Sequence, residues 1–436
     1  MNPCDLIINC AYLLPVAPEN TVLTGRALAI SEGKIISLGT QAEISSQYTS
    51  QNTVNLDHHI VMPGLVNAHG HAAMTLLRGS GEDQALQEWL SETIWPLEGR
   101  LVNEGFVQLG TELAIAEMMQ SGTTTFSDMY FFPEVAAQTA MDIGMRAQIA
   151  FPVIEMPNIW SESVSDGLHK GLALHDTYRH NPLVNIAFGP HAAYTVSEEN
   201  LTRVGMYASE IEAGIQIHLH ENAKEVTDAH SQLGKSHIAQ LSELGLLNPS
   251  LQAVHMTQVS PEDLELLVNS GTSVVHCPSS NLKLASGYCP VHQLQDADIV
   301  VGLGTDGAAS NNGLDMFKEL HLASLLAKHH TANPEQGNAQ DTIKMATLDS
   351  ATVLGLQEDI GSLEPGKFAD VIAVDINAAG MQPMLDPFAT LTHGNCGAQV
   401  SHVWIAGLAT LEKGKLMTIN QVELLEKVNA FTQQHF

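Results

Sequence analysis

The feature that most constrains this chain is an alternation of short apolar segments with helical patterns through its middle. Eight segments, rich in β-branched residues or closed by Gly or Pro, occupy residues 62–66, 123–126, 146–151, 184–188, 214–219, 251–254, 272–275 and 299–303. Helical patterns lie between them, among them 104–120, 133–143, 197–213 and 261–269. Eight strands alternating with helices predict a (β/α)8 barrel of the TIM type, and a doubly wound parallel sheet is the alternative.

Both ends of the chain have a different pattern from the middle. Residues 27–38 predict a hairpin around a Ser-Glu-Gly-Lys turn, and residues 369–375 predict a short strand after a Pro-Gly turn. We therefore expect two domains, a catalytic barrel at 59–363 and a small composite β-sandwich made from residues 1–58 and 364–436.

Histidine or aspartate stands at or just after the end of most of the predicted strands. In chain order these residues are His69 and His71, Asp128, His191, His218 and His220, His255, His276, and Asp306. The carboxyl ends of all strands in such a barrel lie at one face, where active sites are built. A lone histidine is usually a surface or core residue, but this repeated placement favours a functional site at one mouth.

A metal site is the first interpretation of this pattern. His69 and His71 lie two residues apart, so on an extended segment both imidazoles point the same way and suit one divalent metal. A histidine from the fifth strand and Asp306 would complete three nitrogens and one oxygen, leaving a position for water. Spacing alone leaves both His218 and His220 open as the third imidazole.

The neighbouring groups then become candidates for catalysis. A bound metal lowers the pKa of water to about 7, and Glu221 is placed to move a proton. His255 is a candidate to orient the attacking water, while His191 and His276 could do the same or bind substrate. The Gly-rich segment before Asp306 lacks the spacing of a phosphate loop and predicts a turn that presents this aspartate.

The formal net charge of −30 argues against two classes of partner. Nucleic acids and anionic membranes require clustered Lys and Arg, and the charge fits a small uncharged substrate better than a nucleotide. No run reaches the roughly 18 apolar residues of a membrane span. Five cysteines without a CxxC pair, and a start without a basic leader region, predict a soluble protein of the reducing cytoplasm.

Several motifs in order along the chain carry a resemblance to a known family. They are PGLVNAHGH (63–71) with MTLLRG (74–79), SDMY (127–130), GPH (189–191), HLHE (218–221), VHMT (254–257), CPSSNLKLA (277–285), GTDG (304–307) and GSLEPGK (361–367). With them, the sequence closely resembles the amidohydrolase superfamily, in particular its methylthioadenosine/S-adenosylhomocysteine deaminase group, over nearly the whole chain.

The resemblance implies a role for each candidate residue. It implies one zinc ion per chain, with Fe²⁺ or Mn²⁺ as alternatives, and the ligands are His69, His71, His218 and Asp306. The family's His-x-x-Glu motif matches Glu221 as acid/base, and His255 matches the histidine that contacts the hydrolytic water. The substrate-binding matches are His191, Glu98 for ribose hydroxyls, and Trp89 in the same lid-like segment, while His276 is our own candidate for that group.

The reaction that the resemblance implies is hydrolytic deamination of an adenine nucleoside. Metal-activated water attacks C6, Glu221 protonates N1, Asp306 takes the water proton, and ammonia leaves from an inosine-type product. Relatives that accept S-adenosylhomocysteine use arginines near the loop after the third strand, whereas residues 151–161 contain no Arg or Lys, only Glu155. We therefore rank 5'-methylthioadenosine and adenosine above S-adenosylhomocysteine, with Ile154, Met156 and Trp160 expected to suit the methylthio tail.

Two other functions are alternatives to nucleoside deamination. A guanine deaminase or s-triazine hydrolase would keep the scaffold and change the ring, but Glu98 favours a ribosyl substrate. A metal-free scaffold would have lost ligands, and here the full set is present. The partner we expect is a small-molecule nucleoside, and a homo-oligomer is compatible with the sequence.

Overall fold

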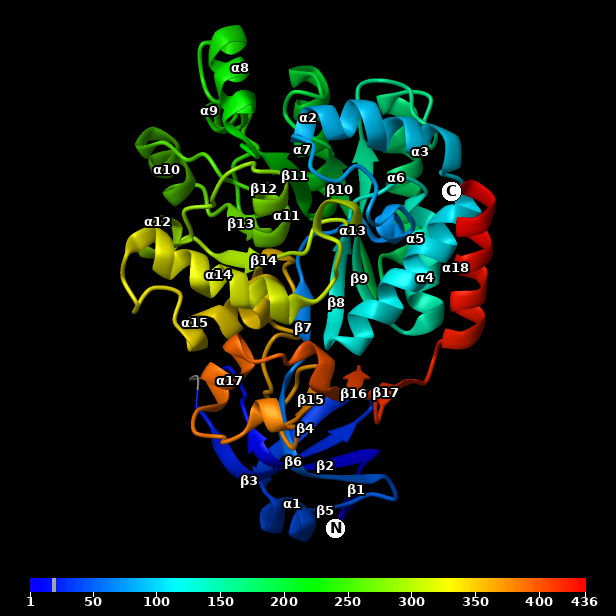
Figure 1. Cartoon of the computed structure of the whole chain (residues 1–436), viewed down its shortest axis with the longest axis vertical. Helices are drawn as coiled ribbons and strands as arrows, with labels where there is room; N and C mark the ends of the chain where they lie inside the picture. The colour runs from blue at the N-terminus through cyan, green and yellow to red at the C-terminus, as the bar shows by residue number, and fades with distance from the viewer. Residues whose placement is uncertain (18–20) are drawn as a thin grey trace.

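A closed parallel barrel forms the centre of the protein (Figure 1). The computed structural model describes residues 1–17 and 21–436, so residues 18–20 of the first predicted β segment lie outside the described residues. In hydrogen-bonded order the strands are β7 (Leu65–Asn67), β8 (Thr123–Asp128), β9 (Arg146–Val153), β10 (Val184–Pro190), β11 (Ile215–Leu219), β12 (Leu251–His255), β13 (Ser273–His276) and β14 (Val301–Leu303). The amide of Ala68 donates to the carbonyl of Leu303 at 2.9 Å, which joins the two edges. The predicted barrel is confirmed, and a doubly wound sheet would have left these edges open.

Helices surround the barrel in the βα order that the sequence predicts. They are α4 (Glu104–Gln120), α5 (Pro133–Ile143), α6 (Val164–Tyr178), α7 (Glu198–Ile211), α8 (Ala223–Leu233), α9 (His237–Glu243), α10 (Pro261–Val268), α11 (Pro278–Lys283), α12 (Val291–Asp296), α13 (Ala308–Asn311), α14 (Met316–Thr331), α15 (Ala339–Lys344) and α16 (Ser350–Val353). Ser197 and Ser260 cap α7 and α10 by accepting hydrogen bonds from backbone amides of the first turn. Every helix in the described residues is too short or too polar to span a membrane.

The first barrel strand begins later than the sequence predicts. Residues 62 and 63 belong to β6 (Thr53–Pro63) of the other sheet, and the barrel strand begins at Leu65. Gly64 is the point of change, because a Cβ atom there would meet the side chain of Thr124 at 2.0 Å. Only glycine allows the chain to pass this close to β8 as it crosses from one sheet to the other.

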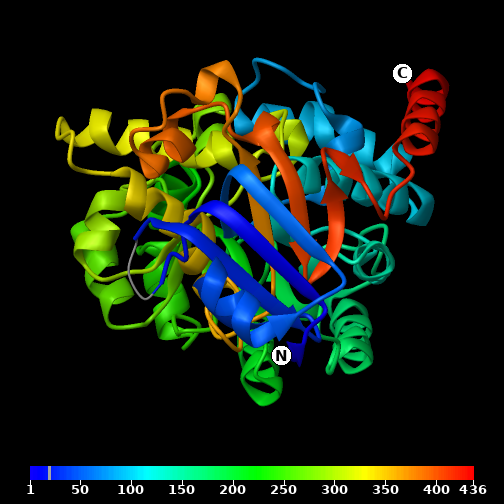
Figure 2. The same cartoon turned by 90° about the horizontal axis from the view of Figure 1, so that it is seen from below.

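Both termini build the second sheet, which lies below the barrel (Figure 2). Its order is β18 (Lys415–Leu416), β17 (Leu408–Glu412), β16 (Val400–Ile405), β15 (Val371–Asp375), β6, β2 (Leu6–Leu13), β3 (Leu23–Ser31) and β4 (Lys34–Thr40). Side chains from both halves share one core, in which Leu28 and Ile35 meet Val371 and Trp404. The β domain expected from the two termini is therefore present.

The C-terminal helix leaves this sheet. Helix α18 (Gln421–His435) lies beside α4 of the barrel, with the ring of Phe431 5.7 Å from that of Phe106 (Figure 1). The domain limits at 58/59 and 363/364 remain our proposal, and α18 is a segment of the terminal part that packs on the barrel.

The mouth of the barrel lies at the end away from the terminal sheet. Gly122, which precedes β8, lies against Ile372 and Val400 of the terminal sheet, so that sheet covers the amino ends of the strands. A segment of residues 86–101, here called the lid segment, crosses the opposite end (Figure 1). It consists of α2 (Leu86–Glu88), the π-helical turn η2 (Trp89–Ile94) and α3 (Trp95–Leu101).

A buried ion pair joins the two parts of the molecule. Arg146, at the start of β9, donates to both carboxylate oxygens of Asp370 at 2.8 and 3.1 Å and to the carbonyl of Pro182 at 2.6 Å. Asp370 also accepts a hydrogen bond from the amide of Ala406 at 2.7 Å, and the guanidinium lies over the ring of Phe368. A pair satisfied this fully fixes the orientation of the terminal sheet against the barrel.

Replacing Asp370 should destabilise the protein strongly. Asp370→Ala leaves the guanidinium of Arg146 buried without its counter-charge, so the free energy of unfolding should fall by about 3–5 kcal/mol. Urea unfolding followed by circular dichroism measures this loss. Glu423→Ala, which breaks the exposed Glu423–Lys427 pair on α18, is the control and should leave the unfolding midpoint unchanged. Equal unfolding midpoints for the two variants would contradict the stabilising role given to the Arg146–Asp370 ion pair.

Candidate active site

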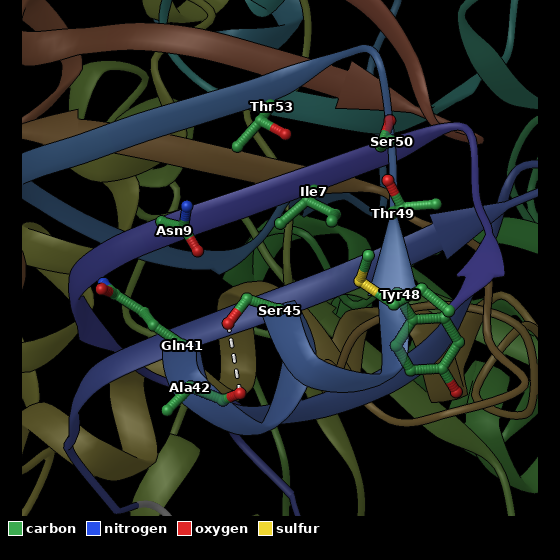
Figure 3. A pocket seen from close by; sticks show the side chains of 10 residues that line it. Ile7, Asn9, Gln41, Ala42, Ser45, Tyr48, Thr49, Ser50 and Thr53 are labelled. Carbon is green, nitrogen blue, oxygen red and sulfur yellow. Dashed lines mark hydrogen bonds between the residues drawn. The ribbon is translucent and has the colours of Figure 1, made fainter.

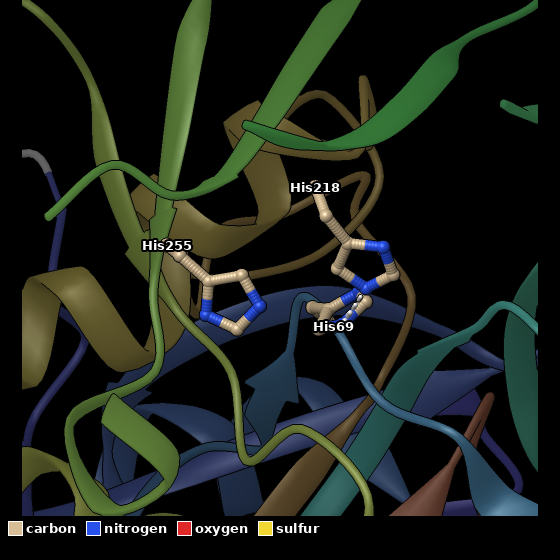
Figure 4. Close-up of side chains that lie close together, drawn as sticks. All are labelled: His69, His218 and His255. Carbon is tan, nitrogen blue, oxygen red and sulfur yellow. Dashed lines mark hydrogen bonds between the residues drawn. The ribbon is translucent and has the colours of Figure 1, made fainter. Parts of the chain in front are cut away.

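Four side chains from three strand ends converge at the mouth. His69 and His71 follow β7, His218 lies on β11 and Asp306 follows β14. The Nε2 atoms of His69 and His218 are 3.2 Å apart, and Oδ1 of Asp306 lies 3.3 Å from Nε2 of His71 and 3.7 Å from that of His69. The residues are buried, apart from a partly exposed His71, and Figure 4 shows His69 and His218 beside His255.

The hydrogen bonds on the far side of each ring determine where its proton lies. Nδ1 of His69 contacts the amide oxygen of Gln216 at 2.8 Å. Nδ1 of His71 contacts the carbonyl oxygen of Met129 at 2.6 Å, and Nδ1 of His218 that of His191 at 2.7 Å. An oxygen of this kind only accepts, so each Nδ1 carries the proton and donates it.

In a neutral ring protonated at Nδ1 the Nε2 atom carries a lone pair, so the three Nε2 atoms and a carboxylate oxygen converge as metal-binding donors. Burial, and next the neighbouring His69, lower the pKa values of His71 and His218, so both rings are neutral near pH 7. Four acceptors this close repel one another unless a cation lies among them. Imidazole nitrogens with a carboxylate are ligands typical of a divalent transition metal, so this donor set fits such an ion.

The structure also distinguishes the two histidines that spacing left open. His220 lies one residue beyond β11, and the chain turns there at a positive φ of 49°, so its side chain is directed away from the cluster and its Nδ1 donates to the carbonyl of Gln258 at 2.8 Å. His218 faces the cluster. His255 lies within reach as well, since ring nitrogens of His69, His218 and His255 lie within 4.8 Å of one another, as do the ligand atoms of His69, His71 and Asp306.

The backbone is strained at these strand ends. His220, His255, Met256 and Asp306 have positive φ values of 49°, 77°, 48° and 61°. Residues other than glycine adopt this region at a cost of about 1–3 kcal/mol each, and such residues concentrate at functional sites. These residues lie at or shortly after the carboxyl ends of β11, β12 and β14, where the chain leaves the strands at the mouth.

Three hydrogen bonds orient Asp306 and His255. Ser280 donates to Oδ2 of Asp306 at 2.6 Å and the amide of Gly307 donates to Oδ1 at 2.7 Å, which favour the ionised carboxylate. Asn281 accepts from Nδ1 of His255 at 2.9 Å, which leaves the other ring nitrogen of His255 3.9 Å from the carboxyl of Glu221.

Glu221 has the opposite ionisation behaviour from Asp306. Its carboxyl group is buried, and burial followed by the charge of Asp306 raises its pKa to about 8. Glu221 therefore carries a proton at neutral pH. A neutral carboxylic acid beside an ionised carboxylate is the pairing that general acid/base chemistry requires.

The four residues expected to bind substrate have different surroundings in the structure. Glu98 of the lid segment accepts a hydrogen bond from the hydroxyl of Tyr130 at 2.6 Å, and burial raises its pKa to about 7. His191 lies beside the cluster, with its ring 5.0 Å from that of His218. Trp89 instead donates its indole N–H to the carbonyl of Ser80 and is buried within the lid. In the described residues His276 is buried, and neither ring nitrogen has a hydrogen-bond partner.

Residues that orient the site were missed by sequence reasoning. Gln216 lies inside a predicted apolar strand, and a polar residue at that position, two before His218, is a signal that could have been used. Ser280 and Asn281 lie in the CPSSNLKLA segment just after His276, and no local pattern there indicates their contacts with Asp306 and His255. Tyr130 also lay in a motif, and its pairing with Glu98 across 32 residues has no local signal.

A hollow in the terminal domain is separate from this chemistry. It has a volume of about 460 Å³ and lies between α1 (Gln41–Gln47) and the strands that carry Ile7, Asn9 and Thr53 (Figure 3). Its lining contains no histidine, carboxylate or basic side chain. It offers none of the groups needed for metal binding or acid/base chemistry.

A barrel with a buried donor set for one divalent metal and a neutral acid at its mouth defines a metal-dependent hydrolase. The sequence matches the amidohydrolase family over residues 60–415. The chain belongs to the amidohydrolase family, and the resemblance seen in the sequence is confirmed.

Individual relatives agree with this assignment. The 5-methylthioadenosine/S-adenosylhomocysteine deaminase of Saccharophagus degradans is 47% identical over 98% of this chain and 96% of its own. The structure is similar to an adenosine deaminase from Xanthomonas campestris with bound zinc, at a TM-score of 0.98, 41% identity, and 100% and 99% coverage. An atrazine chlorohydrolase from Arthrobacter aurescens, at 22% identity, a TM-score of 0.90, and 98% and 99% coverage, shares the fold.

The two histidines at the end of strand β11 give a matched test of the metal site. His218→Gln should abolish stoichiometric binding of a divalent metal, because it removes a ligand from the converging set. His220→Gln, two residues later and directed away from the cluster, should retain it. Metal content after dialysis, measured by elemental analysis of folded protein, decides between them. Full metal content in His218→Gln would contradict the assignment.

Proposed function

We propose that this protein catalyses the zinc-dependent hydrolytic deamination of an adenine nucleoside, giving an inosine-type product and ammonia. The observation that carries the proposal is the buried cluster of three bare imidazole nitrogens and one carboxylate, next to a carboxylic acid that is neutral at pH 7. The names of the relatives support the substrate class. A small-molecule nucleoside is thus the proposed partner, and the five free cysteines support a cytoplasmic location.

In this proposal His69, His71, His218 and Asp306 hold the zinc ion. Bound zinc would supply Lewis-acid activation of a water molecule. The zinc in the similar adenosine deaminase structure supports this choice of metal.

The protein's own residues manage the protons. Attack at C6 of adenine places electron density on N1, so a proton donor is needed there, and Glu221 carries the proton that N1 needs. Asp306, which Ser280 and Gly307 keep ionised, accepts the proton of the attacking water. His255, held by Asn281, orients that water and faces Glu221. On collapse of the adduct, the exocyclic amine takes the proton held by Asp306, the C6–N bond breaks and ammonia leaves, and the proton of the C6 hydroxyl returns to Glu221 as the carbonyl forms.

The remaining groups bind the nucleoside. Glu98, in the lid segment, would accept hydrogen bonds from the ribose hydroxyls, with Tyr130 holding one of its oxygens. His191 lies at the edge of the cluster, where it would contact the nucleoside. A carboxylate in the lid couples binding of the sugar to coverage of the mouth, which excludes bulk water from the reacting ring.

The loop after β9 influences the choice among adenine nucleosides. Glu155 accepts hydrogen bonds from the amide of Ser197 and the side chain of Asn200, contacts that lower its pKa and keep it anionic. Trp160 was expected to line the tail pocket, but its indole is buried and donates to Glu134 of α5, so it is a core residue. Met156 is 73% exposed and remains available for an apolar tail.

These contacts favour 5'-methylthioadenosine and adenosine over S-adenosylhomocysteine. The loop contains no basic residue to pair with an amino-acid carboxylate, and Glu155 would repel one. The alternative on the same scaffold, turnover of guanine or an s-triazine, would leave Glu98 without a sugar to bind. A non-enzymatic scaffold would not need the complete donor set.

A nucleoside panel tests the proposal directly. We expect the zinc-loaded protein to convert 5'-methylthioadenosine and adenosine to hypoxanthine products, with one ammonia released per turnover. Glu221→Gln should lower kcat by about 10²–10⁴-fold, because the proton donor is lost. The absorbance change from adenine to hypoxanthine gives kcat for the wild type and the variant, and an ammonia assay gives the ammonia released per turnover.

The same panel contains the outcomes that would contradict the proposal. Turnover of guanine or an s-triazine, with no nucleoside converted, would support the alternative scaffold function. A kcat/KM about tenfold higher for S-adenosylhomocysteine than for 5'-methylthioadenosine would refute the ranking of substrates while leaving the reaction intact.

The pH dependence of nucleoside binding should depend on Glu98. This carboxyl acts in its ionised form, and its pKa in the free protein is about 7, so kcat/KM for a nucleoside should rise with pH up to about 7. Glu98→Gln removes this titration and should lower kcat/KM about 10–100-fold at pH 8, since a hydrogen bond to a charged acceptor is lost. The ratio of wild type to variant should therefore increase up to pH 7 and level off above it. A ratio that stays constant across pH would remove Glu98 from the sugar site.

A further inference from the structure

A polar layer lies inside the barrel beneath the metal-binding cluster. The interior of such a barrel is mostly filled by branched apolar side chains. Here Gln148 of β9, Gln216 of β11, Gln252 of β12 and Ser127 of β8 are all buried, with exposed fractions of 0–2%. Gln216 is two residues before His218 on the same strand, so its side chain lies on the same face, one layer deeper.

Hydrogen bonds connect the members of this layer, and Oγ of Ser127 accepts from Nε2 of both Gln148 and Gln216 at 3.1 Å. Gln148 and Gln252 form a reciprocal amide pair, with each Nε2 donating to the other's Oε1, at 2.8 and 3.1 Å. Nε2 of Gln216 donates to Oε1 of Gln252 at 2.8 Å and to the backbone carbonyl of Ala68 at 3.0 Å. Since a carbonyl only accepts, the NH₂ group of Gln216 must face Ala68 and Gln252. Its oxygen must then face Nδ1 of His69.

We propose that Gln216 is a positioning residue that holds His69 with its proton on Nδ1 and its Nε2 lone pair directed at the metal. Gln252 and Ala68 keep the Gln216 amide in the orientation that makes this possible. The inference deepens the proposed function and rests on its metal site. Gln216 acts through His69 and contacts neither water nor nucleoside in this scheme.

His69 differs from the other two histidines of the cluster in this respect. His71 and His218 donate to the backbone carbonyls of Met129 and His191, which every single substitution retains. His69 donates to a side chain, so its tautomer and ring orientation depend on the residue at position 216. Loss of such an outer contact typically weakens metal binding about 10–100-fold.

The test compares two buried glutamines from the same layer. Gln216→Met fills a similar volume but removes the acceptor for His69, so the dissociation constant for zinc should rise about 10–100-fold. Gln148→Met makes the same change two hydrogen bonds away and should lower the unfolding temperature without changing the zinc affinity by more than about threefold. Competition between the full-length protein and a chelator gives the affinity without any activity assay.

Two further variants make the test specific. In Gln216→Glu burial favours the neutral carboxylic acid, which keeps one oxygen to accept from His69 and one O–H to donate to Ala68 or Gln252. Its affinity for zinc should therefore remain within about threefold of the wild type. Gln216→Asn shortens the side chain and withdraws that oxygen, so it should reproduce the loss seen with methionine even if the methionine variant does not fold. In the cobalt-substituted protein, the visible absorption bands should shift in the methionine and asparagine variants but not in Gln148→Met.

The possible outcomes separate this inference from the proposed function. Equal zinc affinities in wild type, Gln216→Met and Gln216→Asn would overturn the inference and leave the metal site intact. An equal loss of affinity in Gln216→Met and Gln148→Met would overturn it too, by giving the layer a purely structural role. Wild-type protein that binds zinc but converts no nucleoside would refute the proposed function and leave the role of Gln216 standing.

Discussion

The rest of the site depends on one electrostatic constraint, the convergence of three imidazole Nε2 atoms and a carboxylate oxygen in one small buried space. His69, His71 and His218 each donate Nδ1–H outward, so their Nε2 lone pairs face Asp306 and one another. In water such groups would be solvated separately, and burying them together is costly without a counter-charge. Closure of the barrel brings the first and last strands together and so places the three imidazoles and the carboxylate close to one another. Their mutual repulsion is unfavourable, and a bound divalent cation relieves it.

The same constraint explains how two carboxyl groups a short distance apart take opposite roles. Asp306 receives two hydrogen bonds and faces the cation site, whereas Glu221 is buried without such donors and beside a like charge. The first environment favours the anion and the second favours the acid. The acidic excess of the chain contributes little to this difference, because burial and specific hydrogen bonds set the ionisation of both groups.

The sequence alone predicted the barrel, because each strand is a short apolar run and strand ends share one face. It predicted His69 and His71 from their spacing, but it left His218 and His220 open, since both follow the same apolar run. The direction of each of these side chains is set by contacts that form on folding, here with the carbonyls of His191 and Gln258. The break at Gly64 depends on close approach to Thr124, a contact made 60 residues later, which no local pattern encodes.

The sequence specifies the reacting groups more completely than it specifies the residues that select the substrate. The reacting groups occupy strand ends, and the barrel fixes the positions of those ends. A sequence motif at a strand end therefore also predicts where its side chains lie. The loop after β9 has no such template: Trp160 looked like a pocket residue and is core, while Glu155 is tied to the start of α7. Loop side chains are used for packing or for binding according to contacts made after the barrel has formed. The reaction class therefore follows from the strand ends, and the tail of the substrate is decided by a loop that only the folded protein defines.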